Sequence, residues 1–210
     1  MKVIFKILLT AAVVLLVYMC FRSIMTPIEF DSEKEVREKA IITRLIDIRR
    51  AQIEYKNINK EHAGSFDDLI KFLNEGKIPF VAKEGSLTDE QLESGMTEQE
   101  AIKKGIIKRD TMWYLAKDTI LGPNYNVADI RNVPGTQVQF FMDTATLSSA
   151  SGYTIKVFEA SVKFNDYLND MDKQLLSNLN DKAEKQSRFA GLRVGSLTDI
   201  NNNAGNWENQ

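Results

Sequence analysis

The sequence predicts an α+β protein in which an N-terminal transmembrane helix leads into a long amphipathic helix packed on an antiparallel sheet, with further helices. Three observations support this. An apolar run lies near the N-terminus, residues 33–60 carry apolar side chains at helical spacing, and residues 106–163 alternate as strands do. We therefore divide the chain into a membrane anchor, residues 1–26, and one α+β domain, residues 27–210.

The first segment combines a short basic start with an apolar run. Lys2 and Lys6 precede an unbroken apolar stretch from Ile7 to Phe21, and counting from Val3 it is about long enough to span a hydrocarbon core. We expect an uncleaved signal-anchor. The predicted anchor side chains are Ile7, Leu8, Leu9, Val13, Val14, Leu15, Leu16 and Val17.

Two alternatives and the orientation depend on the flanking residues. A cleaved signal peptide needs small residues at the cleavage site, and the run instead ends Val-Tyr-Met-Cys-Phe-Arg. Lipidation at Cys20 would normally need a small residue before it, where Met19 stands. The short basic tail favours a cytoplasmic N-terminus, although Arg22 and later cations follow on the other side. We expect a single pass through the inner (cytoplasmic) membrane, with the C-terminal domain in the periplasm or outside.

The long helix is expected over residues 33–60, after a kink or short break at Pro27. Its apolar face is wide and suits packing against a sheet or contact with a partner. The candidate interface residues are Ile41, Leu45, Ile48, Arg49 and Tyr55. Arg49 interrupts this face, and two interpretations stand: a buried ion pair with an acid of the domain, or a side chain that extends to solvent at the edge of the face.

A second, short helix follows, and then a polar insertion. Ser65 with Asp68 resembles a capping box, and Gly76 is a plausible stop for this helix. Lys77 to Lys83 is expected to be extended. Residues 84–105 are polar and acidic, which predicts two short exposed helices or a mobile insertion that contacts a partner.

The β-half is expected to be one antiparallel sheet within residues 106–163. Alternation marks strands at 106–120, 137–147 and 153–163, which predicts three or four strands. A helix is expected over 165–187 and one more strand over 191–197. The polar tail NNNAGNWENQ has Trp207 as its only anchor, and is expected to be disordered or packed against the domain.

Composition argues against catalysis and against nucleic-acid binding. The net charge is -2, with Lys and Arg spread among acids, so no basic surplus points to nucleic acid. The single cysteine and the single histidine, His62, exclude thiolate clusters and multi-histidine metal sites. His62 is expected to act as a cation near a helix C-terminus. We predict no enzyme activity and no cofactor.

Two acidic or amide-rich segments and one aromatic set allow alternative interpretations. Asp166, Asp170 and Asp172 suit a helix N-terminus better than a calcium loop, because no glycine supplies the turn. Residues 201–203 with Glu208 could line a cation site, though a tail without a metal is expected. The third set is expected to be core, with an exposed binding stripe as the alternative: Trp113, Tyr114, Phe140, Phe141 and Phe158.

The order of elements over roughly residues 1–75 resembles the type IV pilins and the pseudopilins of type II secretion. The residues that carry the likeness follow the membrane segment: Arg44, Leu45, Ile48, Arg49, Ala51, Gln52, Tyr55, Gly64 and Phe66. The chain lacks the prepilin cleavage motif, since no glycine precedes Ile7 and no acid precedes Glu29. Its GLRVGSLT and NNNAGNWE segments are similar to single-pass envelope proteins of Bacteroidota. The resemblance implies self-association through the apolar helix.

These predictions lead to a structural role. We expect a membrane-anchored, pilin- or pseudopilin-like subunit of a cell-envelope assembly, working as a homo- or hetero-oligomer. The alternative is an anchored periplasmic binding or scaffold module that captures a protein or cell-wall ligand. An exposed aromatic patch on the β-half would favour the alternative, and homotypic contact of the apolar helix would favour the first.

Overall fold

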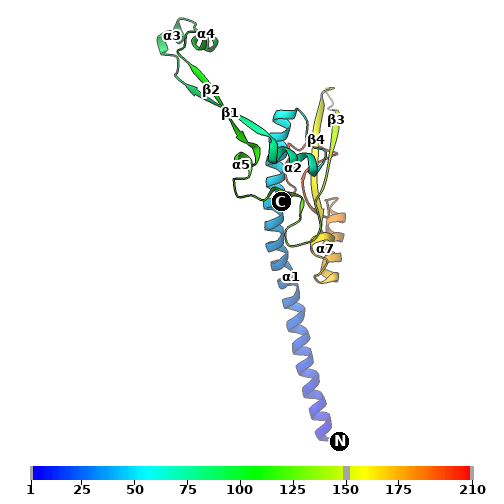
Figure 1. The fold of residues 1–210 in the computed structure, drawn as a ribbon. Helices are drawn as coiled ribbons and strands as arrows, with labels where there is room; N and C mark the ends of the chain where they lie inside the picture. The colour runs from blue at the N-terminus through cyan, green and yellow to red at the C-terminus, as the bar shows by residue number, and fades with distance from the viewer. Residues whose placement is uncertain (1, 149–151, 209–210) are drawn as a thin grey trace. The chain divides into compact units, whose positions relative to one another are not determined.

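The computed structural model describes residues 2–148 and 152–208, which form two compact units (Figure 1). Unit 1 comprises residues up to Arg49 together with those from Ile130 onward, and unit 2 comprises Arg50–Asp129. The first helix, α1 (Lys2–Asn59), contributes to both units. The mixture of helices with antiparallel sheets agrees with the predicted α+β class.

Helix α1 runs without interruption through Pro27, so of the predicted kink or short break the break is wrong. The prediction rested on the missing N–H and the steric demand of a proline ring. The helix nevertheless continues where its side begins to be covered, with Met25 to Pro27 half-buried and Phe30 buried. Ahead of this point the apolar side chains of α1 are exposed.

Unit 1 contains a three-stranded antiparallel sheet with β4 (Thr154–Lys163) in the centre. Strand β3 (Phe141–Ser148) pairs with it along one edge and β5 (Gly191–Gly195) along the other. The core of this unit includes buried residues of α1, of the sheet and of the segment after it: Ile41, Leu45, Ile48, Phe158, Ala160, Val162, Tyr167, Leu168, Leu192 and Val194. The strands predicted at 153–163 and 191–197 are confirmed to within a few residues.

The sheet ends at a glycine that no other residue could replace without strain. Gly195 has φ +74, in the left-handed region, and an added Cβ would overlap the Phe158 carbonyl oxygen of the neighbouring strand. Because no Cβ is present, the backbone at the end of β5 can lie close to the backbone of β4.

The helix predicted over 165–187 is divided in two. A short turn, α6 (Phe164–Tyr167), is followed after a break by α7 (Lys173–Lys185). Asp172 is the reason for the break, because its carboxylate accepts the N–H groups of Gln174 (2.9 Å) and Leu175 (3.0 Å) as the N-cap of α7.

Unit 2 is built around the last turns of α1 and the helix α2 (Phe66–Glu75). The Ser65 hydroxyl accepts the Asp68 N–H, so the predicted cap is confirmed, and Gly76 follows as the C-cap. The loop between the helices is fixed by Gln52, whose buried carboxamide donates to the Ala63 carbonyl and accepts the Ala63 N–H, both at 2.9 Å.

The rest of unit 2 is a two-stranded antiparallel ribbon and its flanking helices. Strands β1 (Lys77–Glu84) and β2 (Lys108–Leu115) pair along their whole length, from Lys77 opposite Leu115 to Glu84 opposite Lys108. Helices α3 (Asp89–Glu93) and α4 (Glu98–Lys103) lie at its far end in Figure 1. Helix α5 (Ala116–Ile120) follows β2, and a 3-10 turn spans Val127–Arg131.

The prediction of one sheet over 106–163 is therefore wrong. The segment 106–120 forms β2 and then α5, and β2 pairs with β1 rather than with β3 or β4. Alternation identifies strands but does not identify their pairing partners, because the same period of two fits any sheet. The two short helices predicted in the insertion 84–105 are confirmed as α3 and α4.

Candidate functional site

The N-terminal part of α1 offers an exposed apolar surface. It is long and apolar enough to cross a membrane, and none of its most apolar window is buried in the chain. All eight predicted anchor residues are exposed: Ile7, Leu8, Leu9, Val13, Val14, Leu15, Leu16 and Val17. In solution such a surface would be unstable, so this part of the helix requires an apolar environment.

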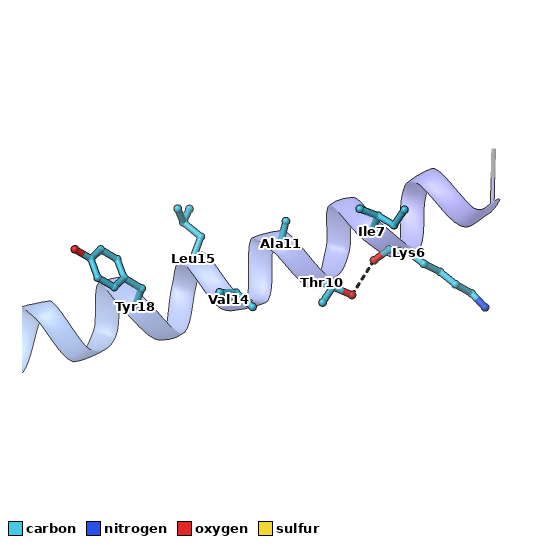
Figure 2. Close-up of a pocket in the computed structure, with 7 residues that line it drawn as sticks. All are labelled: Lys6, Ile7, Thr10, Ala11, Val14, Leu15 and Tyr18. Atoms are coloured by element: carbon cyan, nitrogen blue, oxygen red, sulfur yellow. Dashed lines mark hydrogen bonds between the residues drawn. The ribbon is translucent and has the colours of Figure 1, made fainter.

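One face of this segment is hollowed where small side chains lie between larger ones (Figure 2). Ala11 and Thr10 lie between Ile7 on one side and Leu15 on the other, and Tyr18 and Lys6 close the two ends. The Thr10 hydroxyl donates to the Lys6 carbonyl at 2.9 Å, so its polar atom is satisfied within the helix. We name this surface the anchor face.

The five candidate interface residues on the later part of α1 have different environments. Ile41, Leu45 and Ile48 are fully buried in the chain itself, so they are core residues and a partner cannot reach them without local unfolding. Tyr55 is half-buried in unit 2, where its ring meets that of Phe72 edge-on at 5.2 Å. The expectation that Ile41, Leu45 and Ile48 meet a partner is therefore replaced by a role in the fold, whereas for half-buried Tyr55 it stays a prediction.

Arg49 forms an ion pair with an acid of the domain, as predicted, but the pair is only partly buried, with the Arg49 and Glu208 side chains 23% and 37% exposed. Its guanidinium lies 2.6 Å from the Glu208 carboxylate, which in turn accepts the Gly205 N–H at 3.2 Å. These contacts lower the pKa of Glu208, chiefly through the hydrogen bond from Arg49. The pair fastens the C-terminal tail to α1 within unit 1.

A second cationic contact on α1 was missed in the sequence. The Arg37 guanidinium binds both carboxylate oxygens of Asp170, at 2.6 and 2.8 Å, and donates to the Tyr167 carbonyl at 2.8 Å. One position along, Glu38 accepts the hydroxyl proton of buried Tyr167 at 2.9 Å. The hydrogen bond from Arg37 lowers the pKa of Asp170, and burial raises the pKa of Tyr167. These bonds orient α6 on the helix.

The three acids predicted at a helix start all have structural roles. Asp166 accepts the Lys163 N–H at 3.2 Å in the first turn of α6, Asp172 caps α7, and Asp170 binds Arg37. Within residues 2–148 and 152–208, no group of three or more His, Cys, Asp or Glu side chains is arranged to hold a metal ion.

The tail is packed against the domain as far as residue 208. Gly195 N–H donates to the Ala204 carbonyl at 3.1 Å, and Asn206 N–H donates to the Arg193 carbonyl at 3.0 Å. The Trp207 indole covers Gly205, where an added Cβ would overlap the ring. The oxygen of the Asn201 carboxamide accepts the Asn203 N–H. Of the predicted tail, residues 209 and 210 lie outside the described part.

His62 lies just beyond the end of α1, as predicted, and its side chain is buried, with 6% exposed. It belongs to the loop that Gln52 holds in unit 2. The environment is that of a packed core position near a helix end.

The aromatic set divides between core and surface. Phe158 and Phe140 are buried in unit 1, whereas Trp113 (61% exposed), Tyr114 and Phe141 are exposed. For these three the prediction of a core position is wrong. The alternative, an exposed stripe, holds for Trp113 and Tyr114 of β2. The sequence could not separate the two because period-two alternation is the same for a covered and an uncovered strand.

The large apolar residues of β1 and β2 that are exposed form what we name the aromatic ribbon. Its members are Phe80, Val81, Met112, Trp113, Tyr114 and Leu115. Cross-strand partners share a face, so Phe80 with Met112 and Tyr114 lie on one face, and Trp113 with Val81 on the other. Antiparallel sheets usually have one polar face. The aromatic ribbon instead exposes large apolar side chains on both faces.

The far end of the aromatic ribbon is fixed by charge. The Glu98 carboxylate of α4 bridges Lys83 of β1 and Arg109 of β2, with Arg109 at 3.0 Å. Hydrogen bonds from these cations lower the pKa of Glu98, that from Lys83 most strongly. The Thr97–Glu100 capping box completes the start of α4. These contacts join the far ends of β1 and β2 to α4.

A groove of about 710 Å³ lies in unit 1, and we name it the tail groove. Its wall combines α1, the end of α7, β5 and the C-terminal tail. Cations and aromatic rings that line it were not singled out in the sequence: Lys34, Lys182, Arg188, Phe189 and Arg193. They come from four separate segments of the chain, so no local sequence motif predicts that they meet.

Comparison with known protein families gives no match, and neither does comparison with curated proteins or with solved structures.

Proposed function

We propose that the chain is a membrane-anchored structural subunit of a cell-envelope assembly, with an architecture like that of pilins or pseudopilins. The observation that supports this most is the continuity of α1, from the exposed anchor face into the buried helix of unit 1. A rigid helix that joins an apolar segment to a folded domain places that domain at a fixed point on the membrane.

In this proposal the N-terminus is cytoplasmic, residues 3–25 cross the inner membrane, and the domain lies in the periplasm. The anchor face supports homotypic contact, because Ala11 allows a second helix to approach closely. Two copies that meet along this face would bury the apolar hollow of Figure 2. No step of this role requires a catalytic group or a cofactor.

Intact mass and oligomeric state, measured in mild detergent on protein extracted from its own membrane, test the proposal. The expected result is the full mass and a discrete oligomer that Ala11→Leu dissociates. Ala12→Leu is the matched control, because position 12 lies about 100° around the helix and outside the hollow. A monomer at all concentrations, or equal effects of the two variants, would contradict homotypic assembly. A mass lacking the first residues would contradict the uncleaved anchor.

A second candidate function is an anchored module that captures another protein, and the aromatic ribbon favours it. Trp and Tyr are the side chains enriched in the energetic centres of protein interfaces. Here they lie exposed on a ribbon whose two faces are both apolar. The first candidate explains the anchor but leaves this surface without a role.

Site-specific photo-crosslinking in the native membrane tests the second candidate. A benzoylphenylalanine at Phe80 probes one face of the ribbon, one at Trp113 probes the other, and one at exposed Thr119 of α5 is the control. The same adduct is expected from the two ribbon positions and not from the control. Absence of a protein adduct at both ribbon positions would rule out this function.

A further inference from the structure

The tail groove is lined by cations as well as by carboxylates. Four cations and two carboxylates line it, whereas the chain carries a net charge of -2. The carboxylates are Glu38, which accepts the Tyr167 hydroxyl, and Asp199. A cation that no acid pairs with attracts an anionic group of a ligand, so the question is which of the four cations are unpaired.

Of the four cations that line the groove, two form ion pairs with acids of the described residues and two do not. Arg193 lies 3.4 Å from the buried Glu159 carboxylate, and Lys34 lies 3.5 Å from Asp31. Lys182 and Arg188, at the α7 side, are exposed, and neither takes part in the ion pairs found among the described residues. These two therefore supply the positive charge that a ligand would meet first.

Aromatic side chains also line the groove, among them Phe189 and Trp207. The Phe189 ring lies 5.5 Å from the Arg193 guanidinium, in a cation–π arrangement, and the Trp207 indole covers Gly205. All three of Phe189, Arg193 and Trp207 line the groove. Rings held in this way keep a fixed orientation, so a ligand that stacks on them loses little conformational entropy from the protein.

The polar part of the wall is also rigid. The Asn206 carboxamide donates to the Gly191 carbonyl at 2.9 Å and accepts the Arg193 N–H at 3.1 Å. Asn201 donates to the Ala204 carbonyl at 3.2 Å. The backbone of β5 and of the tail is thereby joined across the groove floor. The groove is preformed, and its volume falls within the range of about 300–1,000 Å³ typical of ligand sites.

We propose that the tail groove binds an acidic oligosaccharide. A sugar ring has an apolar C–H face that packs on an aromatic ring, and hydroxyl edges that exchange hydrogen bonds with amides and hydroxyls. Gln186, Ser187 and Asp199 offer such groups beside Phe189 and Trp207. Carboxylate substituents on the sugar pair with Lys182 and Arg188.

This inference goes beyond both proposed functions, because the residues that line the tail groove belong neither to the anchor face nor to the aromatic ribbon. Assembly through the anchor face and sugar binding can therefore fail independently. Both are measured on the same sample below.

Calorimetric titration of the full-length chain in mild detergent tests the proposal. The probes are trigalacturonic acid, a hyaluronan tetrasaccharide and the disaccharide of N-acetylglucosamine and N-acetylmuramic acid. We expect at least one to bind with a Kd below about 1 mM. Its carboxyl methyl ester should bind at least about tenfold more weakly, since a charge-assisted hydrogen bond is lost. Maltotriose, which carries no charge, should bind as weakly as the ester.

The variant that tests the site is Lys182→Gln with Arg188→Gln, expected to weaken binding at least about tenfold. Both side chains are exposed, so the fold is retained. The matched control is Lys173→Gln with Lys185→Gln, which removes the same charge from exposed positions of α7 outside the groove.

Three results would overturn the proposal: no binding by any of the three acidic sugars, equal weakening by the two double variants, or binding of a hexaglutamate peptide as tight as that of the best sugar. Light scattering of each titrated sample gives the oligomeric state. An oligomer that binds no sugar refutes only the groove assignment, and a sugar-binding monomer refutes only the assembly.

Discussion

Gln52 provides the sharpest test of how unit 2 is held together. Its carboxamide is completely buried and forms two 2.9 Å hydrogen bonds to the backbone of Ala63, which is itself buried. Gln52→Leu keeps the approximate volume but leaves the Ala63 N–H and carbonyl without these partners. A buried unsatisfied group costs about 1–3 kcal/mol, and the gain in apolar burial offsets part of this. We expect a net loss of about 2–4 kcal/mol.

Thermal unfolding by circular dichroism and amide exchange by NMR or mass spectrometry measure this loss. For a chain of this size about 2–4 kcal/mol lowers Tm by roughly 4–16 °C. The Ala63 amide should exchange at least about a hundredfold faster, because its hydrogen-bond acceptor is gone. Gln99→Leu, at an exposed position of α4, is the control and should leave both quantities unchanged.

Gln52→Glu adds a test by pH. A protonated carboxyl can both donate to the Ala63 carbonyl and accept its N–H, as the amide does, whereas a carboxylate can only accept. Burial and the lost donor raise the pKa of this new carboxyl in the folded state above its ordinary value of about 4.3. The contribution to stability is then complete below that value and is lost as the pH rises through the raised pKa. Unchanged Tm and exchange in Gln52→Leu, or a pH dependence like that of the parent chain in Gln52→Glu, would refute the assigned role.

Three further outcomes are expected. Phe158→Ala, in the core of unit 1, should cost about 3–5 kcal/mol, whereas Trp113→Ser, on the exposed ribbon, should change stability by less than about 0.5 kcal/mol; urea denaturation compares them. Arg37→Gln should return the lowered pKa of Asp170 toward 3.8 in a carboxyl ¹³C titration; because the folded pKa is the lower one, the stabilisation by this pair is present above 3.8 and lost as the pH falls through the lowered value. Pro27→Ala should slow amide exchange in the turn around residue 27.

Elements with local signals were predictable from the sequence. The Ser65 cap, the two helices of the insertion and the strand at 153–163 each depend on side chains within a few positions of one another. The cap of α7 was also local, but the acids before it were interpreted as part of one longer helix. One N-cap residue, Asp172, is a small signal beside the apolar spacing of residues 168–179.

What the sequence could not supply is which distant segments meet. Alternation in β2 is compatible with β1, β3 or β4 as a partner, and the choice of β1 removes Trp113 and Tyr114 from a core. For the same reason the sequence does not show that Arg37 binds Tyr167 and Asp170, which lie 130 and 133 positions away along the chain. The tail groove collects residues from α1 to the tail, so its charge balance exists only in the folded chain.

The uninterrupted course of α1 at Pro27 is the point at which local preference and tertiary packing disagree most clearly. A proline inside a helix lacks the N–H that would bind the carbonyl of Ser23, and its ring crowds that carbonyl, at a cost of about 3 kcal/mol. The helix continues because its next turn is covered, with Phe30 buried and then Ile41, Leu45 and Ile48 in the core of unit 1. Pro27→Ala restores the missing donor, so amides 24–31 should become more protected while the domain core is unaffected. Equal protection in the two chains would mean that the Ser23 carbonyl already has another partner, and that continuity at this turn has no local cost for packing to overcome.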